Sequence, residues 1–560
     1  MEDLRTTLLA RRTFLRGAAL GGVGLAAAAV IGCGDDDDDD GAGPAATTAP
    51  LTATATPTAS TGAATATPTA AAAETVKTGS ITVAVQSSVG ETLDPNSTAA
   101  IASDYAGIFD QLLRRDPRTN QYVPEGLATS WEFDTNNQTR WVFNLREADW
   151  NDGTPFTAED VKFTLEYITN PDNKSRLISR LNTVDSVEVL DPRTAVVVTK
   201  APDPILDRRM ISSWVLPKHI YEDPDRGAEW QALSGKPVGT GSYVVDRWIQ
   251  AERTDLVASA SSWRGNKGII EATGANITEG STRASAFEAG DVAAINAPLL
   301  EVARLQGLHN GGVSAAVNVS NAHTNFSVEY HEGPTSDLRV RLALAHALDN
   351  VTYAGLYEGF AEEMQGQQLT RTDFGFNPNV GPYGYDPDMS RTLLRDAGFG
   401  NGFDAPIGQL TGNDPVVDAH TLAVKDAFDE IGLQASIVNI DVSTWRDHIY
   451  GRTPRIMIER WAFSGIGQHD AAFALSWSEG SQPSKFYANA DFDRAFNEAI
   501  QTMDTDAREK KFWEAVQVMH DDPPAVWSTT RPSVVVWRSD QYDLSLWERP
   551  AVFFDQIAVV

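Results

Sequence analysis

The chain has 560 residues, of which 45 are basic and 76 are acidic, and its formal net charge at pH 7 is −31. So negative a chain repels phosphate, which argues against nucleic acid and anionic membrane surfaces as partners. Its single cysteine, Cys33, excludes an internal disulfide framework and a thiolate metal site.

The first 33 residues have the layout of an export signal. Arg11-Arg12 is followed by Phe14-Leu15, and an uncharged stretch, 17–31, ends at Gly32-Cys33. The arginine pair resembles a Tat signal, and the residues around Cys33 resemble a lipobox. The stretch is shorter than the roughly 18 to 20 residues that cross a bilayer. We predict cleavage before Cys33 and lipid attachment to its sulfur; a retained N-terminal membrane helix is the alternative.

Residues 34–75 have the composition of a disordered linker. A run of aspartates, Asp35 to Asp40, is followed by a segment made almost entirely of Ala, Thr, Pro and Gly. Such a segment buries too little apolar area to offset the entropy of ordering. The rest of the chain is long enough for two or three domains.

Beyond the linker, hydrophobic periodicity predicts mixed helices and strands. In chain order the pattern predicts a strand at 80–86, a helix at 101–112, a helix opened by the capping box Thr157-Ala-Glu-Asp160, a hairpin at 184–190 and 194–199, a helix capped by Ser336, a helix at 386–397 closed by Gly398, a helix at 418–431, strands at 433–440 and 455–461, and two helices within 493–519. This mixture predicts an α/β protein with more than one lobe.

Several separated motifs carry a family resemblance. They are Asp152-Gly-Thr-Pro-Phe-Thr-Ala-Glu-Asp-Val-Lys162, Pro237-Val-Gly-Thr-Gly-Ser-Tyr243, Asp337-Leu-Arg-Val-Arg341 with Ala345-His-Ala-Leu-Asp349, and Tyr385-Asp-Pro387 leading to Ala397-Gly-Phe399. Through these motifs and shorter ones such as Leu93-Asp-Pro95 and Trp141-Val-Phe-Asn-Leu-Arg146, which together span about residues 80 to 530, the chain resembles family 5 of the extracellular solute-binding proteins, the oligopeptide, dipeptide and nickel type that serves ABC importers.

The resemblance implies a two-lobed periplasmic-binding-protein-like α/β fold, of the class II or cluster C type. Lobe I would comprise 76–118, 233–310 and 521–560, with an extra subdomain at 119–232, and lobe II would comprise 311–520. The signal, 1–33, and the linker, 34–75, precede them. The ligand would lie between the lobes, as ligands commonly do at domain interfaces.

The resemblance also implies a function. The chain would be a monomeric, lipid-anchored receptor on the outer face of the cytoplasmic membrane, which captures a peptide or other small solute and delivers it to the permease subunits. It would catalyse no reaction and need no cofactor. No pair of its histidines has metal-ligand spacing, so no metal site is expected. An extracytoplasmic hydrolase or a ligand sensor on the same fold is the alternative.

The expected ligand site departs from the family at one position. Peptide-binding relatives carry Trp-x-x-Asp after the strand here placed at 455–461, and its aspartate holds the peptide's amino terminus. This chain has Trp461-Ala-Phe-Ser464. A serine hydroxyl cannot neutralise a buried ammonium, which costs on the order of 3 to 5 kcal/mol when unpaired. Glu459 or Asp470 would have to replace the missing carboxylate, so peptides with free amino termini become less favoured ligands.

Aromatic side chains cluster around this segment of the sequence. The residues expected to bind the ligand are Trp461, Phe463, Ser464, Trp477 and Tyr487. Trp445, Tyr450 and Phe486 lie close by in sequence. Aromatic faces contribute apolar area without fixing a hydrogen-bond pattern, but any one of these rings can equally belong to the core.

Removing the lipidated sulfur tests the anchor. Because Cys33 is the only thiol, Cys33→Ala should leave the protein folded but release it from the membrane fraction. Fractionation followed by a carbonate wash measures this. A variant that stays fully membrane-bound after the wash would show that the N-terminal segment is retained as a membrane helix.

Overall fold

The computed structural model describes residues 77–560 except 87–91, 97–102, 117–120, 176, 319–320, 412–414, 464–468, 483–485 and 545–552. The predicted signal, linker and Cys33, as well as Ser464, lie outside the described residues. Within the described part, no helix combines the length and the apolar character needed to cross a membrane.

The first lobe is built on a seven-stranded sheet in the order β12-β18-β11-β1-β10-β9-β8. Its strands are β1 (Gly79–Val85), β8 (Tyr243–Ile249), β9 (Arg253–Ala258), β10 (Ile269–Asn276), β11 (Ala294–Ala297), β12 (Ser314–Asn318) and β18 (Ser533–Trp537). Strand β1, predicted at 80–86, pairs in parallel with β10 and β11. Its alternation places Ile81 and Val83 in one apolar cluster and Ala84 in another, so both faces of the sheet are covered.

Short helices and a terminal ribbon complete this lobe. They are α2 (Ser103–Ile108), α8 (Gly280–Ala289), α9 (Val302–Gln306), β19 (Tyr542–Asp543) and β20 (Ala558–Val559). Helix α8 supplies Ala284 and Phe287, and α9 supplies Val302 and Leu305, to the cluster that contains Ala84. Helix α2 is shorter than the predicted helix at 101–112, because residues 109–113 have no helical structure.

The extra subdomain has a four-stranded antiparallel sheet in the order β4-β5-β7-β6. Its elements are β2 (Arg114–Arg115), β3 (Tyr122–Val123), β4 (Ala128–Asp134), β5 (Asn137–Leu145), α3 (Ala158–Thr169), α4 (Ile178–Leu181), β6 (Val184–Asp191), β7 (Thr194–Thr199), α5 (Leu206–Arg209), α6 (Lys218–Tyr221) and α7 (Gly227–Leu233). The predicted hairpin is the β6–β7 pair. The predicted capping box opens α3, where the Thr157 amide donates to the Asp160 carboxylate over 2.9 Å.

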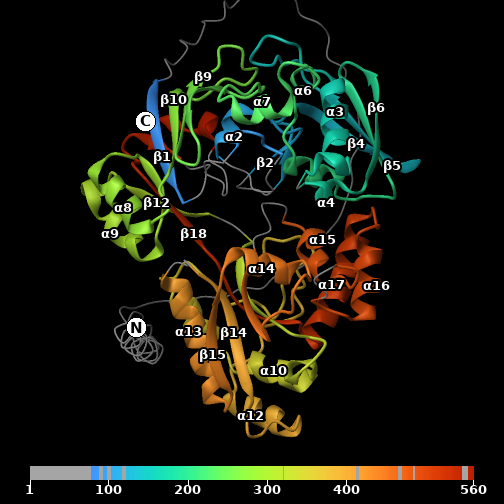
Figure 1. Cartoon of the computed structure of the whole chain (residues 1–560), viewed down its shortest axis with the longest axis vertical. Coiled ribbons are helices and arrows are strands. Elements are labelled where there is room, and N and C mark those ends of the chain that lie inside the picture. Colours follow the sequence, from blue (N-terminus) through green and yellow to red (C-terminus); the bar gives the residue numbers. More distant parts are fainter. Residues whose placement is uncertain are drawn as a thin grey trace, which may run out of the picture. The chain divides into compact units, whose positions relative to one another are not determined.

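The second lobe is built on a five-stranded sheet in the order β15-β14-β16-β13-β17. Its elements are β13 (His323–Val328), α10 (Leu338–His346), α11 (Asn350–Gly355), α12 (Pro387–Asp396), β14 (Asp404–Leu410), α13 (Pro415–Glu430), β15 (Gln434–Ile440), α14 (Val442–Ile449), β16 (Ile458–Phe463), α15 (Ala471–Ala474), α16 (Ala490–Ala499), α17 (Thr505–Asp521) and β17 (Ala525–Thr530). Figure 1 shows α13 lying along β14 and β15.

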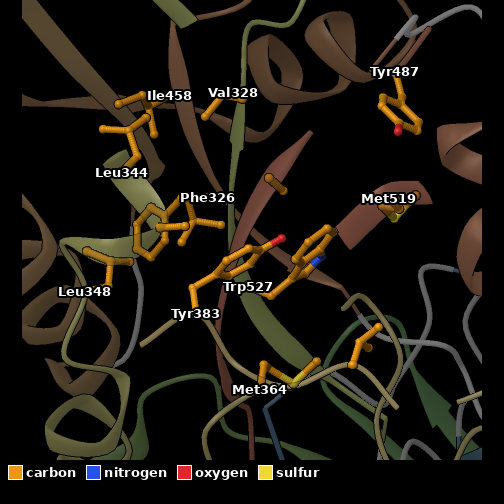
Figure 2. Packing of buried hydrophobic residues seen from close by; sticks show 14 of the residues in the cluster. Phe326, Val328, Leu344, Leu348, Met364, Tyr383, Ile458, Tyr487, Met519 and Trp527 are labelled. Carbon is orange, nitrogen blue, oxygen red and sulfur yellow. The ribbon is translucent and has the colours of Figure 1, made fainter. Parts of the chain in front are cut away.

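The core of the second lobe lies between this sheet and its helices. Phe326 and Ile458 from the sheet are fully buried against Leu344 and Leu348, as Figure 2 shows. Helix α10 therefore turns Val340 and Leu344 into the core. Its cap, however, is Asp337, whose carboxylate accepts from the Arg339 amide over 2.8 Å. Ser336 instead ends a short 3-10 turn, so the predicted cap was wrong by one residue.

Two strands belong to a different sheet from the one that was predicted for them. Strand β12 pairs with β18 in the first lobe, although residues from 311 onward were assigned to lobe II. Strand β17 pairs with β13 in the second lobe, although residues from 521 onward were assigned to lobe I. Both strands adjoin a crossing between the sheets. Sheet membership there depends on partners that are distant in sequence.

A buried cluster of charges holds the C-terminal segment to the first lobe. Asp110 accepts from Arg264 over 2.7 Å, and Asp555 accepts from Arg114 over 3.0 Å and lies 2.9 Å from Arg264. Burial alone would raise the pKa of Asp555, but the charges of Arg114 and Arg264 outweigh it and hold this pKa below its usual value. The C-terminal turn thereby becomes part of the first lobe's core.

Asp555→Asn should destabilise the protein by about 3 to 5 kcal/mol, because it leaves buried arginine charge without its partner. Since the folded-state pKa of Asp555 is lowered, its contribution is present above the unfolded pKa of about 3.9 and disappears as pH falls below it. Urea unfolding at several pH values measures both effects. Glu188→Gln, which breaks the exposed pair with Arg140, is the matched control and should change little.

Candidate functional site

The candidate site lies at the carboxyl edge of the second lobe's sheet. Strands β14, β15 and β16 run in the same direction and end at Leu410, Ile440 and Phe463. In open α/β sheets, ligands bind outside the carboxyl ends of such strands. Helix α14 starts directly after β15, where the Asp441 carboxylate accepts from the backbone amides of Ser443 and Thr444 over 2.8 and 2.9 Å. This cap fixes α14 beside the strand ends.

Three aromatic rings pack together here. The half-buried Trp461 of β16 lies edge-on to Phe486, with ring centroids 4.3 Å apart, and its centroid is 5.8 Å from that of Trp445 on α14. The guanidinium of Arg455 lies 4.6 Å from the centre of the Phe486 ring. Edge-on and cation–π contacts of this kind orient rings as well as stabilise them. The result is a fixed, partly accessible aromatic surface.

Glu459 lies beneath this surface and is 1% exposed. Its carboxylate accepts from Trp461 Nε1 over 3.2 Å and from the Ile456 amide over 3.1 Å, and it lies 2.5 Å from His448 Nδ1. The bond to Ile456 also explains why β16 begins at Ile458 rather than at the predicted residue 455. A carboxylate with these partners orients Trp461 and is not available to hold a ligand's ammonium.

Asp470 is the second carboxylate considered as a replacement, and it is also 1% exposed. Its oxygens accept from the Ala472 amide over 2.9 Å and lie 3.2 Å from Arg508 Nη1. A further ion pair joins it to Arg208 of the extra subdomain. Asp470 is therefore neutralised by the protein's own arginines.

A third buried carboxylate, Asp373, belongs to a segment that lies beside Asp470. Segments 374 and 470 form a parallel bridge, and Asp373 accepts from Asn321 over 2.7 Å and from the Thr370 amide over 2.8 Å. Burial raises the pKa of Asp373 to about 6, and burial lowers the pKa of the neighbouring His469 to about 3. The charge of Arg115, from β2, acts on both groups.

The structure separates the other predicted site residues. Trp477 is half-buried in a 3-10 turn at Leu475–Ser478. Tyr487 is 1% exposed and packs against Tyr330 and Phe492, with centroids 5.2 Å away in each case, so it is a core residue (Figure 2). Phe463 ends β16 opposite His323. Among the predicted site residues whose side chains the structure describes, Trp461 alone joins the aromatic surface, and its partners Trp445 and Phe486 were expected only as neighbours in sequence.

Sequence reasoning missed the residues that pair across elements. His448, Arg508 and Arg208 have no motif that points to Glu459 or Asp470, and Arg208 lies more than 200 residues from Asp470 in the chain. A buried carboxylate requires hydrogen-bonding or charged partners, but the burial of a carboxylate is not visible in a sequence. Among the described residues, no group of three or more His, Cys, Asp or Glu side chains could hold a metal ion.

Two α/β lobes joined by two crossings, with polar and aromatic residues at a strand edge, define a bilobal solute-binding protein. The sequence profile of the bacterial extracellular solute-binding proteins, family 5 Middle, matches residues 122–484. The chain belongs to this family and is an extracytoplasmic substrate-binding protein of an ABC importer. The predicted family, function class and two-lobed α/β fold are confirmed.

Individual relatives are distant. The glutathione-binding protein GsiB of Salmonella choleraesuis is 24% identical over 463 residues, which cover 79% of this chain and 87% of GsiB. The periplasmic binding protein DppA of Helicobacter pylori, solved in complex with the peptide STSA, has a TM-score of 0.73 at 22% identity and covers 86% of this chain and 98% of DppA. NikZ of Campylobacter jejuni, in complex with Ni(L-His), has a TM-score of 0.70 at 20% identity over 84% of this chain and 96% of NikZ.

Glu459→Gln should destabilise the unliganded protein by about 1 to 3 kcal/mol, because an amide cannot accept from all the partners of a buried carboxylate. The same change should alter tryptophan fluorescence, since Trp461 loses its fixed orientation. Urea unfolding and emission spectra measure these effects. Glu430→Gln, at an exposed position on α13, is the control. Equal stability of the two variants would contradict the orienting role of Glu459.

Proposed function

We propose that this chain captures a peptide-like solute between its lobes, at the carboxyl edge of the second lobe's sheet, and hands it to the permease. The proposal rests on the family match and is supported by the aromatic surface at Trp461. Closure of two lobes over a solute shifts an existing equilibrium toward the form that a permease recognises. No step of this cycle requires the protein to make or break a covalent bond.

The preferred solute lacks a free ammonium group of the kind that peptide-binding relatives pair with the aspartate corresponding in sequence to Ser464. The observation that supports this step is the internal pairing of both neighbouring carboxylates, Glu459 with His448 and Asp470 with Arg508 and Arg208. A ligand ammonium buried there would have to displace an arginine or a histidine. Peptides with blocked or distant amino groups, and uncharged solutes that stack on Trp461, meet no such cost. Phe463 and Trp477 are the further aromatic residues proposed to line the site.

The receptor works from the outer face of the cytoplasmic membrane, held by lipid on Cys33, with residues 34–75 as its tether. The support is the arrangement of the twin arginines, the short apolar stretch and the lipobox in the sequence. A monomer suffices for this role, because both lobes belong to one chain.

A thermal-shift screen tests the ligand. The panel contains glutathione, the tetrapeptide Ser-Thr-Ser-Ala, N-acetylated forms of both, and Ni(L-His). A binding solute at about 100 times its dissociation constant should stabilise the protein by roughly 2.7 kcal/mol. Acetylated peptides should stabilise the wild type more than the free ones. Trp461→Ala should lose most of this gain, whereas Trp461→Phe should keep part of it.

The charge at position 464 gives a sharper comparison. Ser464→Asp should improve binding of the free peptides and leave that of the acetylated ones unchanged, because only the former carry an ammonium. Ser464→Asn, of equal size but uncharged, is the matched control and should not discriminate. If free peptides already bind the wild type as well as the acetylated ones, the proposed ligand class is wrong while the family assignment stands.

A further inference from the structure

Helix α5 of the extra subdomain lies between two cores. Leu206, its first residue, packs in the apolar cluster of the four-stranded sheet. Ile205, which directly precedes it, is 4% exposed and packs in the cluster of the second lobe. From the second lobe, Met503, in the loop between α16 and α17, packs against the subdomain's cluster. Adjacent residues thus join parts of the protein that belong to different lobes.

Arginines of the subdomain extend this contact onto the second lobe. The Arg208 guanidinium lies 5.2 Å from the centre of the Phe374 ring and pairs with Asp470. The Arg180 guanidinium of α4 lies 5.7 Å from the centre of the Phe473 ring on α15, and Figure 1 shows these two helices near each other. Phe374 and Asp470 are themselves bridged, because the Phe374 amide donates to the His469 carbonyl over 2.9 Å. Arg208 therefore binds one preformed surface.

Each charge of this contact also has an opposite charge on its own side. Asp470 keeps Arg508, from α17 of the second lobe, at 3.2 Å. On the subdomain side, the negative charge of Asp207, the neighbouring residue on α5, acts on the Arg208 guanidinium and favours its charged form. If the lobes separate, Asp470 and Arg208 each keep an opposite charge on their own side. The pair can therefore break and re-form without the penalty that a stranded buried ion pays.

We propose that the Arg208–Asp470 pair is a latch that stabilises the closed form and sets the open–closed equilibrium of the protein before any solute arrives. Asp470 is buried, but Arg208 keeps 21% of its side chain accessible, so the pair is partly solvated and weaker than a fully buried one. The latch affects the affinity for the solute indirectly, through the closed fraction. Since only closed molecules retain solute, the apparent dissociation constant scales inversely with the closed fraction.

The chain contains a matched control on the same helix. Arg209, adjacent to Arg208, pairs with Asp203 over 2.7 Å and donates to the Arg180 carbonyl over 2.9 Å, all within the subdomain. Arg208→Gln removes a cation that crosses between lobes, whereas Arg209→Gln removes one that does not. Any difference in lobe separation between the two variants is therefore due to the ion pair between the lobes.

Electron spin resonance distance measurements on the unliganded full-length chain test the latch. Spin labels are placed on cysteines introduced at exposed Asn136 and exposed Glu430, in a Cys33→Ala background, so that one label reports each lobe. Arg208→Gln should lower the ratio of closed to open molecules about three- to tenfold. Arg209→Gln should leave the ratio at the wild-type value. Neither result depends on knowing the solute.

A double-mutant cycle separates a latch from a general loss of packing. Asp470→Asn keeps the cap on the Ala472 amide, and it should lower the closed fraction as Arg208→Gln does. The double variant should show no further drop, because the two residues act through one pair. Should Asp470→Asn fail to fold, the comparison of Arg208→Gln with Arg209→Gln carries the test. Identical distance distributions for Arg208→Gln, Arg209→Gln and the wild type would overturn the proposal.

Discussion

The architecture depends on two places where the chain passes from one sheet to the other. Strands β12 and β13 flank the first crossing, and β17 and β18 flank the second. Strand β18 lies between β11 and β12, and β17 forms the edge of the other sheet beside β13, so each crossing is held by hydrogen-bonded strands at both ends. Two crossings restrict relative motion of the lobes to bending at these segments. A solute-binding mechanism by closure follows from this constraint.

Four buried carboxylates of this protein are paired with arginine or histidine side chains of the same chain, and this bears on what the proposed site can bind. Asp555 and Asp110 hold arginines in the first lobe, and Glu459 and Asp470 hold a histidine and arginines in the second. A buried charge without a partner would destabilise the fold, so each pairing is first a requirement of stability. In the proposed site, Glu459 and Asp470 already have partners within the chain, and we infer that selectivity comes from the aromatic surface and from shape.

The sequence predicted most elements because their signals are local. The capping box at Thr157, the turn between β6 and β7, and Gly398 with a φ of 90° after α12 are all decided within a few residues. The boundary strands β12 and β17 were misassigned because partner choice is not local. Tyr487 was predicted to bind ligand, but an aromatic residue near a site and one in a core have the same sequence signature, and packing against Tyr330 and Phe492 decides between them.

Affinity in such a protein is divided between contacts to the solute and the equilibrium that closes the lobes. In the proposed mechanism, the aromatic surface at Trp461 acts on the first term and the Arg208–Asp470 pair on the second, and none of the three rings belongs to the pair. Evolution can therefore change the solute by altering positions such as 464 without resetting closure. It can equally tune closure through α5 without altering specificity. DppA, solved with a peptide, and NikZ, solved with Ni(L-His), share this fold, so the fold itself is compatible with chemically different solutes.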